Sequence, residues 1–130
     1  MDYVKIAGKV YDCLVISIEQ DFTIIYSENT GRSLDGAMFL DPIGTFIGHV
    51  VTFAARGDNV KEFDDLFNFL KIPRNSGVMV NVVNDQSTMQ YEAYVSNGKR
   101  KVSIIDGNSG KVRWESLQVH FIPVSPQVKP

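Results

Sequence analysis

The residues best suited to acid–base or nucleophilic chemistry in this 130-residue chain are few and widely separated. There are two histidines, His49 and His120, and one cysteine, Cys13. Nucleophilic catalysis requires a nucleophile with a base beside it, and no such pair is adjacent in the sequence. Both histidines fall in alternating, strand-like segments, so we expect sheet histidines that are half-exposed or hydrogen-bonded to a neighbour. Cys13 lies in an apolar segment without a cationic neighbour, which predicts a buried, unreactive thiol.

Other catalytic and metal-binding patterns are also incomplete. One cysteine and two distant histidines do not form a structural zinc site. The segment 106–110 begins like a calcium loop, but Leu117 stands where the closing glutamate belongs. Asp35 and Asp41 flank a short strand and are separated by roughly 15–20 Å at strand rise, whereas Asp64 and Asp65 belong to the polar face of a predicted helix. The sequence therefore predicts no catalytic residue, no metal, no cofactor and no enzymatic activity.

Basic residues gather near the C-terminal strands. Five of the 13 basic residues lie there, namely Lys99, Arg100, Lys101, Lys111 and Arg113. A charged hairpin of this kind blocks edge-to-edge strand pairing, which is the interpretation we favour. The same cluster can also contact phosphate or an acidic protein surface. With Tyr91, Tyr94 and Trp114 nearby, a nucleic-acid-binding β-barrel that uses the 97–113 hairpin region is the alternative function.

Composition sets the broad class of protein. Hydrophobic residues make up 44% and charged residues 22%, as in ordinary globular domains. The formal net charge of −2 gives no field that would attract nucleic acid or an acidic membrane. No apolar run is long enough to span a membrane, the N-terminus lacks the layout of a signal peptide, and one cysteine excludes an intramolecular disulfide. We expect a protein that is made in the cytoplasm.

Alternation of period two predicts strands along most of the chain. The predicted strands are 4–6, 11–18, 22–26, 37–40, 45–54, 78–83, 89–96, 99–105 and 111–124. The segment 11–18 is apolar on both faces near its middle, so we expect both faces to be covered. Asn97-Gly98 predicts a type I′ hairpin turn, and 106–110 a second turn, which together give a three-stranded meander.

One segment has helical periodicity. Over 59–71, the apolar residues Phe63, Phe67 and Leu70 recur at spacings of three and four. Asp58 or Asn59 is the expected cap, and Pro73 ends the segment. The fold class is therefore mainly β (α+β): an antiparallel β-sandwich or partly open barrel of about eight strands with one helix packed on it. We expect one domain over 1–124 and a flexible C-terminal tail over 125–130.

The segment 31–38 has the sequence GRSLDGAM and is followed by Asp41 and by Gly44-Thr45. It resembles the G-R-[ST]-[LM]-D-G-x-M stretch that leads into a strand in small tail-associated proteins of tailed bacteriophages and prophages. Similar too are the helix that ends near Pro73, the Tyr94-Val95-Ser96-Asn97 region, and Trp114 followed by LQVHFIP at 117–123. Together these pieces extend from about residue 20 to residue 123.

The resemblance implies a virion structural component of the tail-tube, distal-tail or baseplate type, whose partners are copies of itself in a ring and neighbouring tail proteins. It offers no catalytic residues. Gly31 and Gly36 are then expected at bends of a contact arm, with Arg32 and Asp35 paired locally or across subunits. The candidate contact residues are Arg32, Asp35, Met38, Lys99, Arg100 and Lys101. The third hypothesis, after the structural protein and the nucleic-acid-binding barrel, is a hydrolase whose site is assembled from distant residues that include His49 and His120.

Overall fold

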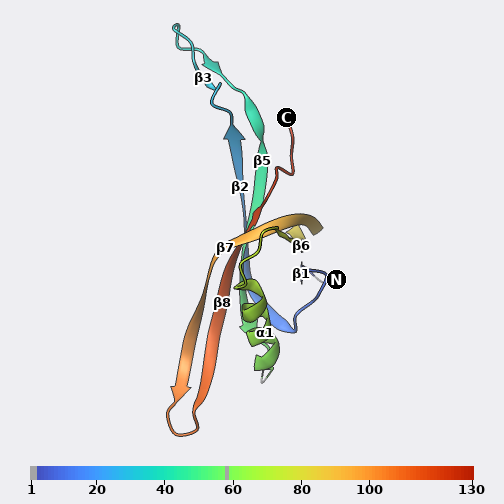
Figure 1. Ribbon diagram of the computed structural model, residues 1–130, viewed down its shortest axis with the longest axis vertical. Coiled ribbons are helices and arrows are strands. Elements are labelled where there is room, and N and C mark those ends of the chain that lie inside the picture. Colours follow the sequence, from blue (N-terminus) through green and yellow to red (C-terminus); the bar gives the residue numbers. More distant parts are fainter. Residues whose placement is uncertain (1–2, 58) are drawn as a thin grey trace.

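The computed structural model describes residues 3–57 and 59–130 and is mainly β with one helix (Figure 1). The strands are β1 (Val4–Ile6), β2 (Cys13–Tyr26), β3 (Gly31–Arg32), β4 (Met38–Phe39), β5 (Pro42–Ala55), β6 (Val78–Asn84), β7 (Ser87–Asp106) and β8 (Lys111–Pro123); the helix is α1 (Val60–Leu70). Within the described residues, six strands form one antiparallel sheet in the order β1-β6-β7-β8-β5-β2, and β3 pairs with β4. The predicted fold class, an antiparallel β-fold with one helix, is confirmed.

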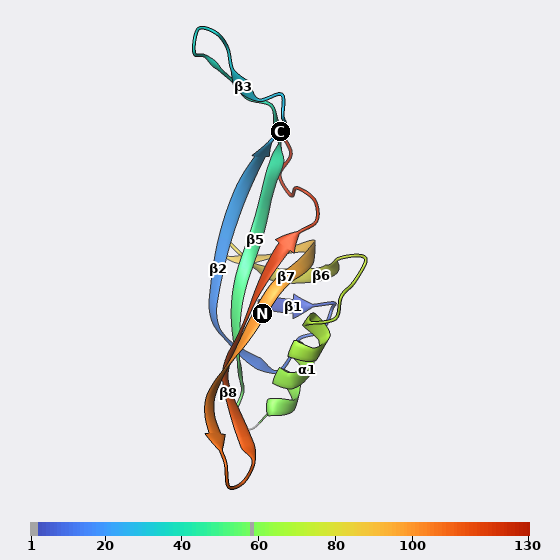
Figure 2. The same ribbon diagram turned by 60° about the vertical axis from the view of Figure 1, so that its left-hand side comes forward.

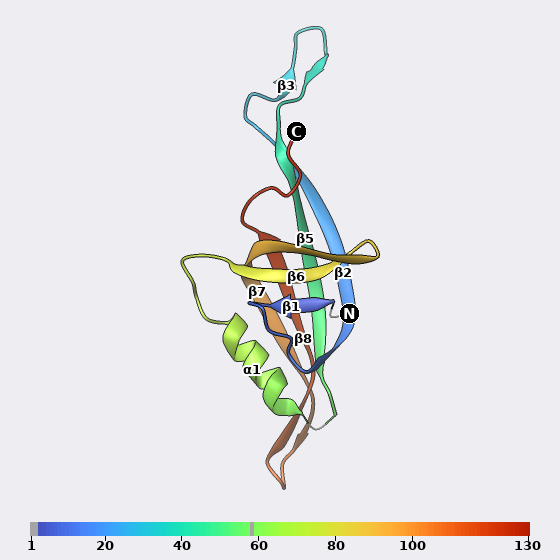
Figure 3. The same cartoon turned by 90° about the vertical axis from the view of Figure 1, so that its right-hand side faces the viewer.

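The sheet folds over on itself at β7. The first part of this strand pairs with β6, and the rest pairs with β8 down to Asp106. In Figures 1 and 3, β1, β6 and the first part of β7 run across the direction of β5 and β8. The β7–β8 register shifts between Val95 and Gly98, which is where a bulge turns a strand around the corner of a bent sheet.

This corner corrects two sequence predictions. Asn97-Gly98 was expected to reverse the chain, but β7 keeps the same partner, β8, on both sides of the dipeptide. The chain therefore bends there without turning back, and the predicted three-stranded meander is wrong. The second predicted turn is present: Gly110 N–H donates to the carbonyl of Asp106 at 2.9 Å, and β8 follows.

Helix α1 covers the concave side of the bent sheet (Figure 3). Its buried face consists of Phe63, Leu66 and Leu70. They join a core to which every strand of the large sheet contributes, including Val51 and Phe53 of β5 and the β8 residues Leu117, Val119 and Phe121. In the described part of the chain, no helix is long and apolar enough to cross a bilayer.

The expected helix cap is not formed. The Asn59 side chain donates to Asp12 Oδ2 at 2.7 Å and makes no capping hydrogen bond. Arg56 Nε donates to the other Asp12 oxygen at 2.9 Å, so this carboxylate joins the end of β5 to the start of α1. The other candidate cap, Asp58, lies outside the described residues.

The strands β2 and β5 are each 14 residues long and pair from Cys13↔Ala55 to Tyr26↔Pro42. The sequence predicted two strands in place of β2, because Glu19, Gln20 and Asp21 interrupt the apolar pattern. Pairing with β5 continues through these three residues, since an equally long strand presents a partner for each of them. In Figure 2, the far ends of β2 and β5 extend beyond the core as a ribbon.

The predicted C-terminal tail contacts β5 in the structure. Residues 125–130 lie beside the start of β5, where Val128 forms a bridge with Thr45. Gln127 adds side-chain hydrogen bonds to Ile47. Two prolines suggested a free segment, but β8 leaves this part of the β5 edge without backbone partners, and the tail supplies them.

We predict that Leu66→Ala lowers the free energy of unfolding by about 2–5 kcal/mol, because it removes buried methyl groups and leaves a cavity under α1. The matched control is Asn68→Ala on the exposed face of the same helix, which is expected to change it by less than about 0.5 kcal/mol. Urea denaturation measures both. Equal effects of the two substitutions would contradict the packing described for α1.

Candidate functional site

The two histidines lie on opposite faces of the sheet. His49 pairs with Phe121, and its neighbour Val50 pairs with His120. Because paired residues share a face and successive residues alternate, His120 is on the face opposite His49. The described structure therefore does not bring the two imidazoles into one site.

His49 is fully buried, and both of its ring nitrogens are occupied. Nε2 lies 3.0 Å from the Val83 carbonyl oxygen, which can only accept, so Nε2 carries the proton. Nδ1 then accepts from the Tyr91 hydroxyl at 2.8 Å. Burial lowers the pKa of His49. The side chain is a neutral core histidine with no nitrogen free to act as a general base, as its position in a strand predicted.

Cys13 is also buried, and burial raises the pKa of its thiol to about 11. The thiolate, which is the nucleophilic form, is thus disfavoured at neutral pH. This agrees with the expected unreactive thiol.

His120 belongs to a polar surface on the other face of the sheet. Its Nε2 lies 3.5 Å from Asp21 Oδ2 across the ladder. A shallow pocket beside it is lined by Glu19, Lys99 and Gln118. The surface carries both acidic and basic groups, and the Asp21 and His120 side chains are 56% and 35% exposed. It is therefore suited to ion pairing rather than to a desolvated reaction.

Two pairs of aspartates could in principle do acid–base chemistry, Asp35 with Asp41 and Asp64 with Asp65. In each pair the two carboxylates bind different partners. Asp41 accepts from the Ser27 hydroxyl, and Asp35 accepts from the Ser33 hydroxyl. Asp65 pairs with Lys61 on α1, while Asp64 accepts from Arg100. None of these contacts joins the members of a pair.

Arg100 is part of the packing between α1 and the β7–β8 hairpin. The centre of its guanidinium lies 3.8 Å from the ring centroid of Phe67 and 3.9 Å from that of Trp114. Its Nη1 donates to Asp64 Oδ1 at 2.9 Å, and 17% of the side chain is exposed. A planar cation between two aromatic faces, with a carboxylate at its edge, is a stabilising arrangement that lysine cannot reproduce. Arg100, a candidate contact residue, thus has its contacts within the chain.

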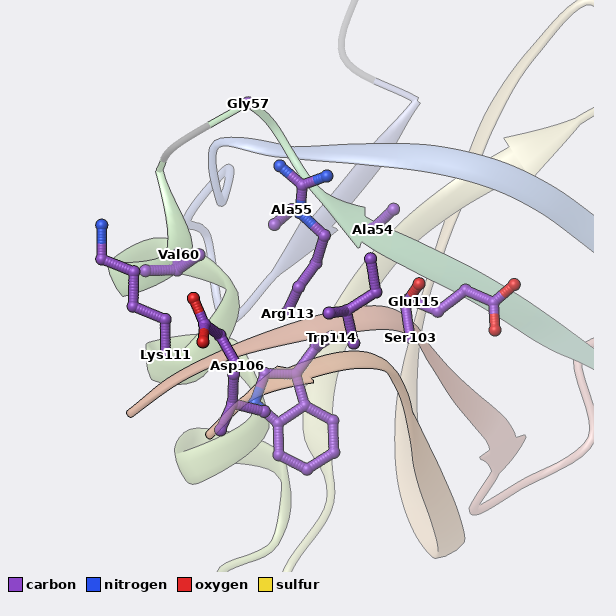
Figure 4. A pocket seen from close by; sticks show the side chains of 12 residues that line it. Ala54, Ala55, Gly57, Val60, Ser103, Asp106, Lys111, Arg113, Trp114 and Glu115 are labelled. Carbon is purple, nitrogen blue, oxygen red and sulfur yellow. The ribbon is translucent and has the colours of Figure 1, made fainter. Parts of the chain in front are cut away.

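A groove lies beside this cluster and follows the β7–β8 hairpin toward its turn, which Asp106 and Lys111 flank (Figure 4). Ala54, Ala55 and Val60 line one part of it, and Lys111 and Arg113 of β8 line another. Lys101, also in the basic cluster, pairs with Glu115 at 3.2 Å. The basic cluster is therefore partly neutralised by acidic residues of α1 and β8.

A run of exposed apolar side chains follows β2. This strand is at the edge of the sheet, with β5 as its neighbour on one side only. Its exposed apolar side chains are Leu14, Val15, Ile16, Phe22, Ile24, Ile25 and Tyr26. Phe22 and Ile24 share a face with their β5 partners Ile47 and Thr45, whereas Ile25 points to the opposite face. The sequence predicted that both faces of 11–18 would be covered. In the structure Cys13 is buried, but Leu14, Val15 and Ile16 are exposed.

A hairpin arm, residues 27–41, extends from the end of this ribbon (Figures 1 and 2). Arg32 Nη1 donates to the Gly36 carbonyl at 3.0 Å, and Asp35 accepts from the Ala37 N–H at 3.1 Å. Hydrogen bonds lower the pKa of Asp35, and the bond from the Ser33 hydroxyl has the largest effect. Arg32 and Asp35 therefore shape the tip of the arm.

The glycines of the arm differ in role. Gly36 has a φ of +89° and lies at the bend expected for it, whereas Gly31 lies in β3 and not at a bend. Four large apolar side chains of the arm are exposed: Leu34, Met38, Phe39 and Leu40. A polar scaffold thus presents apolar groups at the far end of the molecule.

Comparison with known proteins returns no relatives: no family model, curated protein or solved structure matches this chain. The inference of function therefore rests on the surfaces described above. Sequence reasoning missed the edge position of β2, although the two-sided apolar pattern of 11–18 was its visible signal. It also missed the contacts of Gln127, for which one glutamine in a proline-containing segment gave no signal.

Burial of neutral His49 makes stability depend on pH. Its pKa in the folded state is below the ordinary value of 6.5, so the unfolded chain takes up the proton first. The free energy of unfolding should therefore fall as pH falls below about 6.5, with a slope of at most about 1.4 kcal/mol per pH unit for one proton. Urea denaturation between pH 7.5 and 5 measures it. His120→Gln should keep this slope and His49→Gln should lose it. The reverse pattern would contradict the conclusion that buried His49 causes the pH dependence.

Loss of the Arg100 stack should destabilise the hairpin end of the molecule. Arg100→Ala is expected to lower the free energy of unfolding by about 1–3 kcal/mol and to change the fluorescence of Trp114, the one tryptophan of the chain. Lys99→Ala, at the exposed neighbouring position, is the control and should change neither. The same result for both variants would show that the stack contributes nothing measurable.

Proposed function

We propose that this chain is a structural subunit of a tailed-phage or prophage-derived particle, and that it assembles through β2 and the hairpin arm into a ring, a tube or a tail-end complex. The observation that carries the proposal is that β2 is apolar on both faces and yet exposed at an open sheet edge. A segment with this composition is normally covered. A second protein chain is the natural cover.

The chemistry of the β2 edge favours strand addition. An edge strand presents unpaired N–H and C=O groups, and proteins usually protect such edges with lysine, proline or short length. This 14-residue strand has neither lysine nor proline, and Glu19 and Asp21 are its only charges. Pairing with another strand would satisfy its backbone groups, and burial of Phe22 alone would contribute about 1.5–3 kcal/mol.

Ring or tube formation needs contacts between two different surfaces of the subunit, since these repeat from copy to copy until the circle closes. The large sheet offers two different edges, β1 and β2. The arm adds a third surface, with Met38 and Phe39 exposed on β4. These exposed groups support the proposal that the arm contacts the next copy or a neighbouring tail protein.

The nucleic-acid alternative has less support. Of the aromatic residues that were its candidate stacking platform, Tyr91 is buried against His49 and Trp114 is stacked by Arg100. Among them Tyr94 keeps an exposed ring. Salt-dependent DNA and RNA binding assays test this alternative, and absence of binding at low salt would remove it.

Self-assembly is the direct test. We expect light scattering coupled to size exclusion to give a mass that rises with concentration, and negative-stain images to show rings or tubes. Phe22→Lys should shift the assembly to concentrations at least about tenfold higher, because it inserts a charge into the edge contact. Phe22 is 70% exposed, so the fold itself should be unaffected.

The matched control is Ile72→Lys, which introduces the same charge at a 52% exposed apolar position after α1. It should assemble like the unmodified chain. A protein that remains monomeric at every concentration, alone and mixed with the products of adjacent genes, would contradict the proposed function. Tail-tube and tape-measure genes beside this one would support the assignment to a tail.

A further inference from the structure

The C-terminal segment makes strand-like contacts with β5. Thr45 N–H donates to the Val128 carbonyl at 2.8 Å, and Gln127 N–H donates to the Thr45 carbonyl at 3.1 Å. The β8 register on β5 begins only at His49. The tail therefore continues the ladder along a stretch of the β5 edge that β8 does not reach.

The Gln127 side chain replaces a backbone partner. Its Oε1 accepts from Ile47 N–H at 2.9 Å, and its Nε2 donates to the Ile47 carbonyl at 2.8 Å. A residue of a paired strand would make the same two bonds with its own N–H and C=O. The outward backbone groups of Thr45 and Ile47 are thus satisfied by two residues of the tail.

Hydrogen bonds rather than burial hold the tail. Val128 is 51% exposed and Val124 is 44% exposed. Each such bond contributes modestly, because the groups exchange water for protein partners. These bonds depend on where residues 127 and 128 lie and not on which chain carries them.

The site on β5 is shaped for this segment. A Cβ added at Gly44 would lie 2.6 Å from Cβ of Pro126 and 2.8 Å from the Val128 carbonyl oxygen, so only glycine allows the tail to lie there. The C-terminus lies at the root of the hairpin arm, beside the β2–β5 ribbon (Figure 2). The tail is therefore next to the surfaces through which we propose that copies meet.

We infer that the C-terminal segment is exchanged between copies: in the assembly, residues 126–130 of one subunit bind the Gly44–Ile47 edge of a neighbouring subunit. This inference rests on the proposed function, since exchange requires neighbours. The partner is a second copy of this chain, because the edge matches the tail of the chain itself. Exchange replaces each hydrogen bond by an identical one. The tail of a neighbouring copy that is held nearby therefore competes on equal terms with the chain's own tail for the β5 edge.

Mixing two single-substitution variants, Thr45→Cys and Val128→Cys, tests the exchange. Neither variant can form a disulfide between positions 45 and 128 within one chain, so a disulfide-linked dimer from the assembled, oxidised mixture reports the tail of one copy on β5 of another. We expect the dimer fraction to be at least several-fold above that of either variant alone. Cys13 is buried in both and contributes only to that background.

Two controls complete the experiment. The double variant, oxidised as a dilute monomer, should form the link within the chain, which shows that the pair can bond; its failure to do so would contradict the docking site itself. Adding Gly44→Val to the Thr45→Cys partner should abolish the dimer. An assembly that gives no dimer above background overturns the exchange alone, whereas absence of any assembly overturns the proposed function and the exchange with it.

Discussion

The β2–β5 ladder is longer than the core that it covers, and the other features of the molecule follow from this mismatch. Both strands have 14 residues. Near Cys13 and Phe53 they pack on the core, but beyond Ile18 the β2 residues are exposed up to Tyr26. A ladder with paired backbone groups but uncovered side chains remains as a ribbon. It carries the arm, leaves an apolar edge open, and gives the tail a strand to pair with.

The opposite end of the molecule shows how the chain completes its own core. β7 turns the sheet around a bulge at 95–98, and α1 closes the concave side with Phe63 and Leu66. Arg100, between aromatic rings of α1 and β8, joins the helix to the hairpin. Local packing therefore satisfies this end, whereas the ribbon end leaves contacts to be made with other chains.

Local patterns in the sequence predicted the elements that local forces determine. The apolar spacing of 59–71 predicted the helix, and the alternation in 4–6 and 78–83 predicted β1 and β6. Long-range pairing determined what was missed. Only the equal length of β5 makes β2 continuous through Glu19–Asp21, and only pairing with β8 on both sides turns Asn97-Gly98 into a bulge. Similarly, the Arg100–Asp64 and Gln127–Ile47 hydrogen bonds join residues more than 30 positions apart.

Hydrogen–deuterium exchange of the β2 amides, in dilute and in assembled protein, tests the central claim most directly. If the open edge of β2 is the assembly contact, exchange in 19–26 should slow by about tenfold or more on assembly, because its outward N–H groups gain partners. The tip of the β7–β8 hairpin serves as the internal reference. Assembled protein in which β2 exchanges as fast as in the dilute monomer would contradict the account.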